Sequence, residues 1–535
     1  MEQDGLYKLL NNQWKTTCRI LFGFEVGNLD EYKEWLTELN NPKLVKKSSN
    51  SGIETVFTNN AFSENAKFIS MDEVDFNKKF EPLDINEIKD IDSILQALQE
   101  RFYYCGNIVL GNSKFVEKSS NVTDSFFVYN SVKISDCKNI VYSQYLRLCE
   151  NIFGTNEGGE SKFCIRCSIL FKNMRCFELW KSTSCSDCYY SFGLDSCRDT
   201  FFSFNLVGKQ YAIGNRTLPK DKFFEIKKKL LSEIVEKLKK DKRLPSLVEV
   251  VGKTTEHSEA LKLVEIMAKD DVTSDKSVIE DLFSKTSSVL FGKSLEGGID
   301  TYDRWLRSHI VIPYPLKSVL SKKQIQMSDW PGLSQLPKEK LVTYDEARNI
   351  AANIKISERQ AENLTLDNAF DLLSSIAYYS PEQSTGRNLN LIDCQWGSDA
   401  SNCYKSVICV YSKNCAYCSW PRSSENCFGC GIAFDCDSSM KCYDSVKLTR
   451  CLEVDGGRNS HDAYFCHNIE GLRNALFCFN VKSLRHAIGN LEVGKETYEK
   501  VKKLVINEIL DELESKKSLK WDIFNLMESS IKRER

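Results

Sequence analysis

Residues 403–430 of this chain read CYKSVICVYSKNCAYCSWPRSSENCFGC, and the spacing of cysteines in this stretch decides the fold. Two series with a 12-residue period run through it, three positions apart: Cys403, Cys415, Cys427 and Ser406, Cys418, Cys430. From Leu391 to Ala475 the first series continues without insertion or deletion. A fixed period of this kind indicates a repeat architecture.

The same period occurs earlier in the chain. Its first series, interrupted by one three-residue insertion, runs through Ser113, Ser125, Cys137, Cys149, Cys164, Cys176, Cys188 and Thr200. Turns of this length that are rich in Cys, Ser, Asn and aromatic residues fit stacked short β-strands better than helical repeats. The sequence therefore predicts two parallel β-solenoids of about eight turns each.

A 12-residue turn leaves room only for small side chains in its interior. With about 3.3 Å per residue, the contour of one turn is roughly 40 Å. Free cysteine behaves as a small hydrophobe, so alternation of Cys with Ser, Thr, Ala or Val along a series is expected from packing alone. Asn402, Asn414 and Asn426 precede successive turns, where their amides can hydrogen-bond along the stack.

The chain also repeats as a whole. Residues 21–23 and 29–36 recur as 290–292 and 299–306, and Ala212-Ile213-Gly214-Asn215 recurs as Ala487-Ile488-Gly489-Asn490. The offset changes only from 269 to 275 along the chain. We therefore expect two tandem modules that pack on each other as an intramolecular pseudo-dimer.

The predicted class is α+β, with two modules that each contain a small α/β region, a narrow parallel β-solenoid and a C-terminal capping helix. Apolar residues at helical spacing place the capping helices near Phe223–Leu238 and Tyr498–Leu513. The expected segments are residues 1–105 (α/β region), 106–215 (solenoid), 216–285 (capping helix and linker), 286–380 (α/β region), 381–490 (solenoid) and 491–535 (capping helix).

Composition and charge limit the class of protein. The 535 residues carry a formal net charge of −2, which gives no global footprint for nucleic acid but leaves room for a local basic patch. The chain has no long uninterrupted apolar run and begins with a polar segment, so we expect no membrane association and a cytoplasmic location. The 22 cysteines are then expected to be reduced thiols.

Zinc binding is one alternative for the cysteines. The pairs Cys415/Cys418 and Cys427/Cys430 supply four thiolates, a set that can hold zinc tetrahedrally. These pairs are continuous with series in which other turns lose one member, so packing is favoured over zinc. No cofactor is the first expectation, and a zinc-binding or redox protein is the alternative.

Catalytic patterns are sparse. The chain contains five histidines, and His467, next to Cys466, is expected on the outer, solvated face of a strand rather than as a base for a nucleophile. Gly292-Lys293-Ser294 lacks the first glycine of a phosphate-binding loop. We expect a protein without enzymatic activity, although a β-solenoid can bring distant carboxylates together, which leaves an enzyme with a site on the solenoid flank as a further alternative.

Two strings carry a family resemblance, Ser424–Cys430 and Lys209–Asn215, the second being followed by a lysine-rich helix. They resemble uncharacterised cysteine-rich β-helix proteins of archaea, of candidate bacterial phyla and of their viruses. The resemblance covers each solenoid and the helix that follows it. It implies the solenoid fold and no particular activity.

The sequence thus predicts a scaffold or binding protein, an accessory factor or component of a large intracellular assembly such as a ribosome or a virion-like particle. An outward row of aromatic side chains would suit a large protein or ribonucleoprotein partner. Lysines of the first capping helix add a basic patch, although a solvated helix face also explains them. The candidate partner-binding residues are Phe126, Phe177, Tyr189, Phe201, Tyr404, Phe428, Tyr464, Lys227, Lys228 and Lys229.

Overall fold

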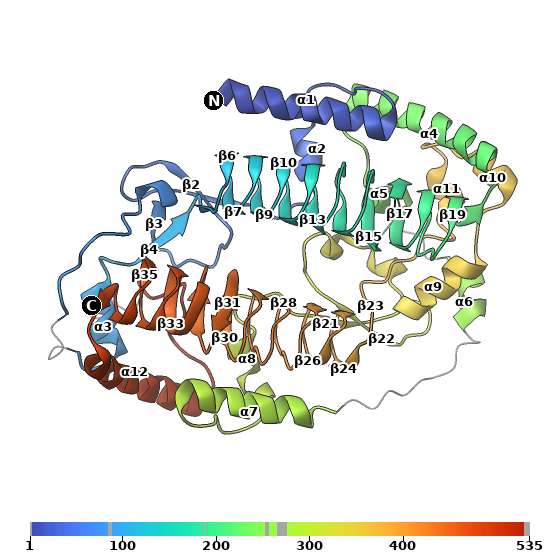
Figure 1. The fold of residues 1–535 in the computed structure, drawn as a ribbon. Helices are drawn as coiled ribbons and strands as arrows, with labels where there is room; N and C mark the ends of the chain where they lie inside the picture. Colours follow the sequence, from blue (N-terminus) through green and yellow to red (C-terminus); the bar gives the residue numbers. More distant parts are fainter. Residues whose placement is uncertain are drawn as a thin grey trace.

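A computed structural model describes residues 3–83, 88–183, 186–189, 191–251, 256–264 and 275–528. The chain combines helices with many short parallel strands, so the predicted mixed α+β class is confirmed. Two stacks of strands run side by side, with helices along their outer sides (Figure 1). No helix in the described ranges has the length and apolar character needed to cross a bilayer.

The first stack begins after β4 (Tyr103–Gly106) and ends at residue 217. One side of it is β5 (Val109–Leu110), β7 (Ser120–Thr123), β9 (Val132–Ser135), β11 (Gln144–Arg147), β13 (Asn156–Gly159), β14 (Ser168–Phe171), β15 (Leu179–Thr183) and β17 (Ser191–Asp195). The other is β6 (Lys114–Glu117), β8 (Phe126–Tyr129), β10 (Lys138–Val141) and β12 (Glu150–Phe153), followed by β16 (Ser186–Tyr189), β18 (Arg198–Phe201), β19 (Gln210–Ile213) and β20 (Arg216–Thr217).

The second stack spans residues 383–492. Its strands are β23 (Gln383–Thr385), β24 (Leu389–Ile392), β25 (Trp396–Ser398), β26 (Ser401–Tyr404), β27 (Ile408–Val410), β28 (Trp420–Arg422), β29 (Ile432–Phe434), β30 (Met440–Tyr443), β31 (Ser445–Thr449), β32 (Leu452–Asp455), β33 (Arg458–Glu470), β34 (Arg473–Leu476), β35 (Phe479–Lys482), β36 (Arg485–Ile488) and β37 (Leu491–Glu492). Each stack closes on an antiparallel pair, β19 with β20 and β36 with β37.

Parallel pairing in both stacks advances by one 12-residue period, as in Ser120 with Val132 and Leu391 with Cys403. The three-residue insertion expected in the first stack is wrong, because Glu150 pairs with Lys162 at the same period. Within each turn the backbone enters the left-handed region at about every third residue, for example at Lys118, Asn121 and Asp124 with φ near +50°. Each turn therefore has four short sides. The many Asn and Asp residues at these corners lower the cost of the left-handed backbone, because they tolerate left-handed φ.

The residue after each corner points into the stack, which produces four interior series where the sequence analysis recognised two. A third series runs through Ser119, Ser131 and Ser143, all buried. Each serine Oγ accepts the N–H of the next member one turn later, at 2.9 Å to Ser131 and 3.0 Å to Ser143. Cysteine does the same, since Cys149 N–H donates to Cys137 Sγ at 3.3 Å. Thiols and hydroxyls thus satisfy backbone donors inside the stack.

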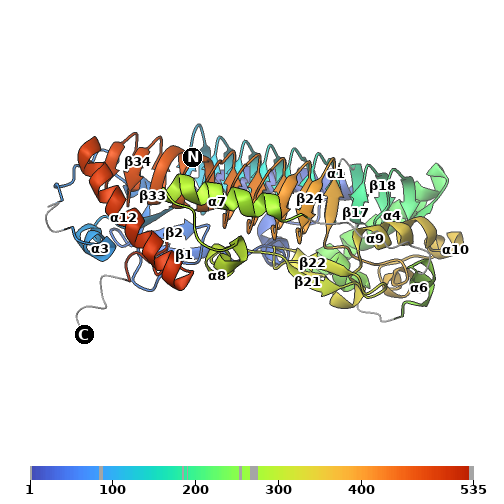
Figure 2. The same cartoon turned by 90° about the horizontal axis from the view of Figure 1, so that it is seen from below.

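Helices cover the aromatic side of each stack. On the first lie α1 (Gln3–Phe22), η1 (Leu29–Tyr32), α2 (Lys33–Thr37) and α4 (Lys220–Asp241), and on the second α7 (Ser277–Phe291), η4 (Ile299–Tyr302), α8 (Asp303–Leu306) and α12 (Lys495–Lys516). The expected capping helices α4 and α12 lie along this side rather than across the stack end (Figures 1 and 2). Their apolar residues pack on outward aromatic rings, as Phe223 does with Tyr211 at 5.7 Å.

The remaining elements pack on the stack of the opposite half. Beside the end of the second stack lie β1 (Leu44–Lys47), β2 (Glu54–Phe57), β3 (Lys67–Ser70), η2 (Met71–Glu73) and α3 (Ile91–Leu98), and beside the end of the first lie β21 (Tyr314–Lys317), β22 (Gln324–Met327), η5 (Leu333–Gln335), η6 (Lys338–Lys340), α9 (Tyr344–Asn353), α10 (Glu358–Glu362) and α11 (Ala369–Leu373), with α6 (Ser258–Val264) against α9 (Figure 1). The same bond occurs in both places: Asn480 Nδ2 donates to the Tyr103 carbonyl at 2.7 Å, and Asn205 Nδ2 donates to the Tyr378 carbonyl at 2.9 Å.

The chain after each long helix is held by a buried glutamate of the stack. Leu247 N–H, at the start of α5 (Leu247–Val251), donates to Glu178 Oε1, and Ile523 N–H donates to Glu453 Oε2 at 3.1 Å. Both glutamates are fully buried. Each glutamate therefore holds the segment that follows the long helix against its stack.

The two stacks also touch each other, with early turns of the first beside late turns of the second (Figure 1). Lys133 Nζ lies 2.7 Å from Asp444 Oδ1 in this contact, and both side chains are largely buried. Farther along, Lys181 lies over the ring of Trp396 at 5.8 Å. Charged and aromatic side chains therefore join the two halves.

Candidate functional site: an open first turn

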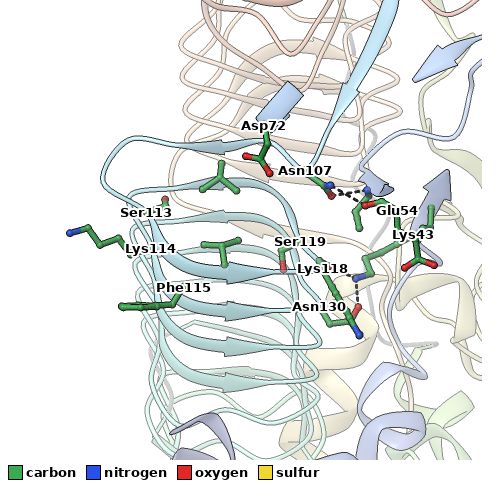
Figure 3. Close-up of a pocket in the computed structure, with 14 residues that line it drawn as sticks. Lys43, Glu54, Asp72, Asn107, Ser113, Lys114, Phe115, Lys118, Ser119 and Asn130 are labelled. Atoms are coloured by element: carbon green, nitrogen blue, oxygen red, sulfur yellow. Dashed lines mark hydrogen bonds between the residues drawn. The ribbon is translucent and has the colours of Figure 1, made fainter. Parts of the chain in front are cut away.

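A pocket of about 460 Å³ lies at the beginning of the first stack, above its first turn (Figure 3). We call it the open-turn pocket. Its volume is in the range of small ligand sites. It is lined by Lys43, Val45, Glu54, Val56, Asp72, Asn107, Val109, Ser113, Lys114, Phe115, Val116, Lys118, Ser119 and Asn130.

The pocket exists because the first interior residues are small. Three interior series of the first stack begin at Ser113, Val116 and Ser119, and these residues form its floor. In the second stack the corresponding end is filled by larger side chains. Asn388 Nδ2 there donates to the carbonyls of Thr385 and Gly397 at 3.1 Å, and Leu391 projects toward Gly397.

The floor of the pocket ends in the exposed edge of a sheet. Among the described strands, β6 is the last of its sheet and pairs only with β8. In later turns, backbone groups directed toward the preceding turn include both donors and acceptors. Asn130 N–H donates back to the Glu117 carbonyl at 3.0 Å, and the Ser125 carbonyl accepts from Lys114 N–H at 3.1 Å. In the first turn, the backbone N–H and C=O groups that point in this same direction face the pocket instead of another strand.

The roof of the pocket comes from the β1–β2 hairpin and η2. Asn107 fixes the hairpin to the stack: its Oδ1 accepts Val56 N–H at 2.9 Å, and its Nδ2 donates to the Glu54 carbonyl at 3.1 Å (Figure 3). Asp72, in η2, lines the same side. The hairpin and η2 therefore bound the space above β6.

Lysines surround the opening. Lys43 Nζ donates to the Lys118 carbonyl at 3.0 Å and also to Asn130 Oδ1. Burial, with the nearby charges of Lys33 and Lys118, lowers the pKa of Lys43 to about 8. Lys114 and Lys118 are exposed, and two acidic residues, Glu54 and Asp72, also line the pocket. The pocket has more cationic than anionic side chains.

The corresponding turn of the second stack holds a segment of this same chain. Asn390 Oδ1 accepts Asp275 N–H at 3.1 Å, and Asn390 Nδ2 donates to the Asp275 carbonyl at 2.7 Å. In the first stack the position of Asn390 is occupied by Phe115, which is 41% exposed. Its ring stacks on Phe127 with centroids 5.0 Å apart.

The four thiols of the zinc hypothesis are buried in two interior series of the second stack. They face backbone carbonyls: Cys415 Sγ lies 3.2 Å from the Lys413 carbonyl, and Cys418 Sγ lies 3.3 Å from the Ala416 carbonyl. Corresponding contacts exist for Cys427 and Cys430. Among the described residues, no group of three or more His, Cys, Asp or Glu side chains is arranged to hold a metal ion.

The expectation of an exposed aromatic row is wrong for six of the seven residues. These side chains point outward from the stacks but are covered by the flanking helices: Phe177, Tyr189, Phe201, Tyr404, Phe428 and Tyr464 are each at most 5% exposed. Tyr464 Oη, for example, donates to the Leu290 carbonyl of α7 at 3.0 Å. Phe126 is half-buried. The rings belong to the core between stack and helices.

The three lysines of the predicted basic patch differ in their surroundings. Lys227 is half-buried, with Nζ 4.7 Å from the centre of the Tyr189 ring. Lys229 is exposed and donates to the Leu364 carbonyl at 3.2 Å, and Lys228 is also exposed. They do not line the open-turn pocket.

His467 is buried and not solvated as its position after Cys466 suggested. Its Nδ1 lies 2.9 Å from Asp455 Oδ2, and its Nε2 accepts Cys105 N–H at 2.8 Å. The α/β region of the first half covers this face of the second stack, which a strand pattern alone does not reveal. The arrangement fixes His467 as a structural link between the halves.

A second pocket, of about 540 Å³, lies between the segment 310–315 and Lys405. Its lining residues also include Asp303, Arg307 and Asp329. The open-turn pocket is the stronger candidate of the two because it combines an unpaired strand edge with charged side chains.

Comparison of the chain with models of known families, with curated proteins and with solved structures finds no match.

Sequence reasoning did not identify the open-turn pocket. A signal was available in the repeat itself, since the first interior positions of the two stacks differ in size, Ser113 and Val116 against Asn388 and Leu391. The neighbouring hairpin, however, meets the stack through contacts such as Asn107 with Val56, which no local pattern encodes.

Proposed function

We propose that this chain is a non-catalytic binding protein, a component or accessory factor of a large cytoplasmic assembly such as a ribosome or a virion-like particle. The observation that carries the proposal is the open-turn pocket, where an edge strand faces a cavity lined by Lys43, Lys114 and Lys118. Exposed strand edges are sites at which another chain can pair. The aromatic side of each stack, by contrast, is covered by the chain's own helices.

The scaffold in this proposal is a duplicated β-solenoid whose halves pack as a pseudo-dimer. The constant 12-residue pairing register supports the solenoid, and it agrees with the resemblance to cysteine-rich β-helix proteins. Recurrence of one contact in both halves supports the duplication, as in Asn205 with Tyr378 and Asn480 with Tyr103. Such a body is rigid, which suits a part that holds a partner at a fixed position.

Sedimentation of native cell extract tests the proposal. The extract is run through a sucrose gradient under reducing conditions at low and high salt, and the protein is followed by mass spectrometry. We expect comigration with a large particle at low salt and release at high salt, because polar contacts weaken as charges are screened. Sedimentation as a free monomer or dimer at both salt concentrations would refute the assembly role.

A further inference from the structure

The edge of β6 offers the hydrogen-bonding groups that a polypeptide backbone needs. In a parallel stack, the side of a strand facing the preceding turn carries alternating N–H and C=O groups. Later turns use them in this way, as Asn130 N–H with the Glu117 carbonyl and Lys114 N–H with the Ser125 carbonyl. A ligand that presents only acceptors, such as a phosphate, would satisfy the donors of this edge but not its carbonyls.

The second stack shows how this chain fills the same position. There the Asn390 amide both accepts from and donates to the backbone of Asp275, which directly precedes α7, so polypeptide backbone lies against the first turn. In the first stack, Phe115 stands at this position with its ring 41% exposed. The second stack thus shows that polypeptide backbone fits against this turn.

Charge narrows the choice of polypeptide. Lys114 and Lys118 are exposed at the edge, and Lys43 Nζ keeps a third N–H beyond those used by Asn130 and the Lys118 carbonyl. If the first turns of two copies of this chain paired with each other, their lysines would lie side by side, and like charges on paired strands are destabilising. An acidic segment instead complements them.

We propose that the open-turn pocket binds an extended acidic segment of a partner protein, which adds to β6 as one more strand. The inference rests on the proposed function, since it names the partner chemistry of the same site. Backbone pairing supplies affinity in this mode, and side chains that alternate along the strand supply selectivity. In the pairing register of the stack, where Lys114 pairs with Phe126 and Val116 with Val128, a small apolar side chain of the segment would lie on Val116. Acidic side chains two positions before and after it would lie over Lys114 and Lys118.

The probe is a fluorescein-labelled pentapeptide with valine at its centre, glutamate at both ends and threonine between them, titrated with the full chain and followed by fluorescence anisotropy. Three further peptides separate the contributions: one with lysine in place of both glutamates, the original sequence with N-methylated backbone, and a scrambled peptide with its glutamates adjacent. We expect measurable binding of the first peptide only. N-methylation removes backbone donors, so equal binding of that peptide would overturn strand addition.

Two variants locate the binding. The double variant Ser113→Asn with Val116→Leu, called the filled-end variant, gives the first stack the larger side chains that close the same end of the second stack. It is expected to abolish binding while leaving the thermal unfolding temperature unchanged. Lys114→Glu with Lys118→Glu is expected to weaken binding about tenfold, since both attractions between exposed charges become repulsions. The matched control is Lys447→Glu, an exposed lysine on β31, which should bind as the unaltered chain does.

The outcomes separate this inference from the proposed function. Comigration with a particle, combined with peptide binding that the filled-end variant retains, would keep the assembly role and overturn the pocket assignment. Peptide binding lost in that variant, without comigration, would keep the pocket and refute the assembly role. Binding of an oligo-uridylate that the filled-end variant loses, with no peptide binding, would replace the polypeptide by a nucleic acid and overturn the inference.

Discussion

The rings of Tyr145 and Trp420 lie 6.4 Å apart between their centroids, in the contact between the two stacks. These residues are 275 positions apart, the same offset that relates the two stacks along the sequence. A residue that touches its own counterpart must lie near an axis that exchanges the two halves. This contact therefore supports the proposed pseudo-dimer and places its axis beside these rings.

Contacts exchanged between the halves give the first prediction. Gly489 has φ +54°, and a Cβ placed on it would lie 2.2 Å from Leu98 Cδ2 of the other half. Gly489→Ala should lower the free energy of unfolding by about 3 kcal/mol, from left-handed strain and overpacking together. Urea denaturation measures the loss.

Gly208→Ala is the matched control for this change. Gly208 has φ +59°, and a methyl group added there would meet no atom within 4 Å, so only the strain remains. We expect a loss of about 1 kcal/mol. Equal losses for the two variants would contradict the close approach of Leu98 to the second stack.

How far the sequence predicts this structure depends on how local each signal is. The 12-residue period and the amide series through Asn402, Asn414 and Asn426 are confirmed. The side-chain amides of this series are joined by hydrogen bonds of 3.1 and 3.2 Å. Their geometry follows from the repeat alone. Helix positions also follow from periodicity, since α4 covers residues 220–241 where apolar spacing predicts a helix.

The site is less accessible to sequence reasoning. Outward aromatic residues such as Phe428 look like a binding surface until the helix that covers them is known, and Phe283 of α7 lies 5.4 Å from that ring. His467 changes from a surface residue to a buried link for the same reason. Both errors come from contacts between segments that lie far apart in the sequence, in the second case in opposite halves of the chain.

Glu157 gives a prediction for pH dependence. It is buried, its Oε2 accepts the Trp330 Nε1–H at 2.6 Å, and burial raises its pKa to about 7. A carboxyl whose pKa is raised on folding stabilises the protein below its unfolded pKa, and this contribution is lost as pH rises toward 7. The free energy of unfolding should fall by up to about 3 kcal/mol between pH 4.5 and 7 from this group.

Glu157→Gln isolates the effect, because the amide oxygen can still accept from Trp330. The variant should match the unaltered chain near pH 4.5 and exceed it by up to about 3 kcal/mol at pH 8, measured by urea denaturation across this range. Glu496→Gln, at an exposed position of α12, serves as control and should show no such trend. A constant difference at all pH values would contradict the assignment.

His467 gives a prediction about the link between the halves. His467→Ala leaves the carboxylate of Asp455 buried without its imidazole partner and Cys105 N–H without an acceptor. The expected loss in the free energy of unfolding is about 3 kcal/mol. His467→Gln, which can both accept and donate, should recover most of it, and His461→Ala, at a half-buried position, should cost under about 1 kcal/mol. Equal effects at His461 and His467 would argue against the buried link.

The buried thiols give the last prediction, which also tests the zinc alternative. Burial raises the pKa of Cys418 well above its ordinary value, and a neutral thiol reacts slowly with maleimide because the thiolate is the nucleophile. In native protein, Cys394 should be labelled first because it is half-buried, while Cys415, Cys418 and Cys427 should be labelled only after denaturation. Mass spectrometry of the labelled peptides gives the order, and metal analysis of freshly purified protein should find no stoichiometric zinc. Zinc at one equivalent per chain, released by a chelator as the protein unfolds, would instead assign these thiols to a metal site.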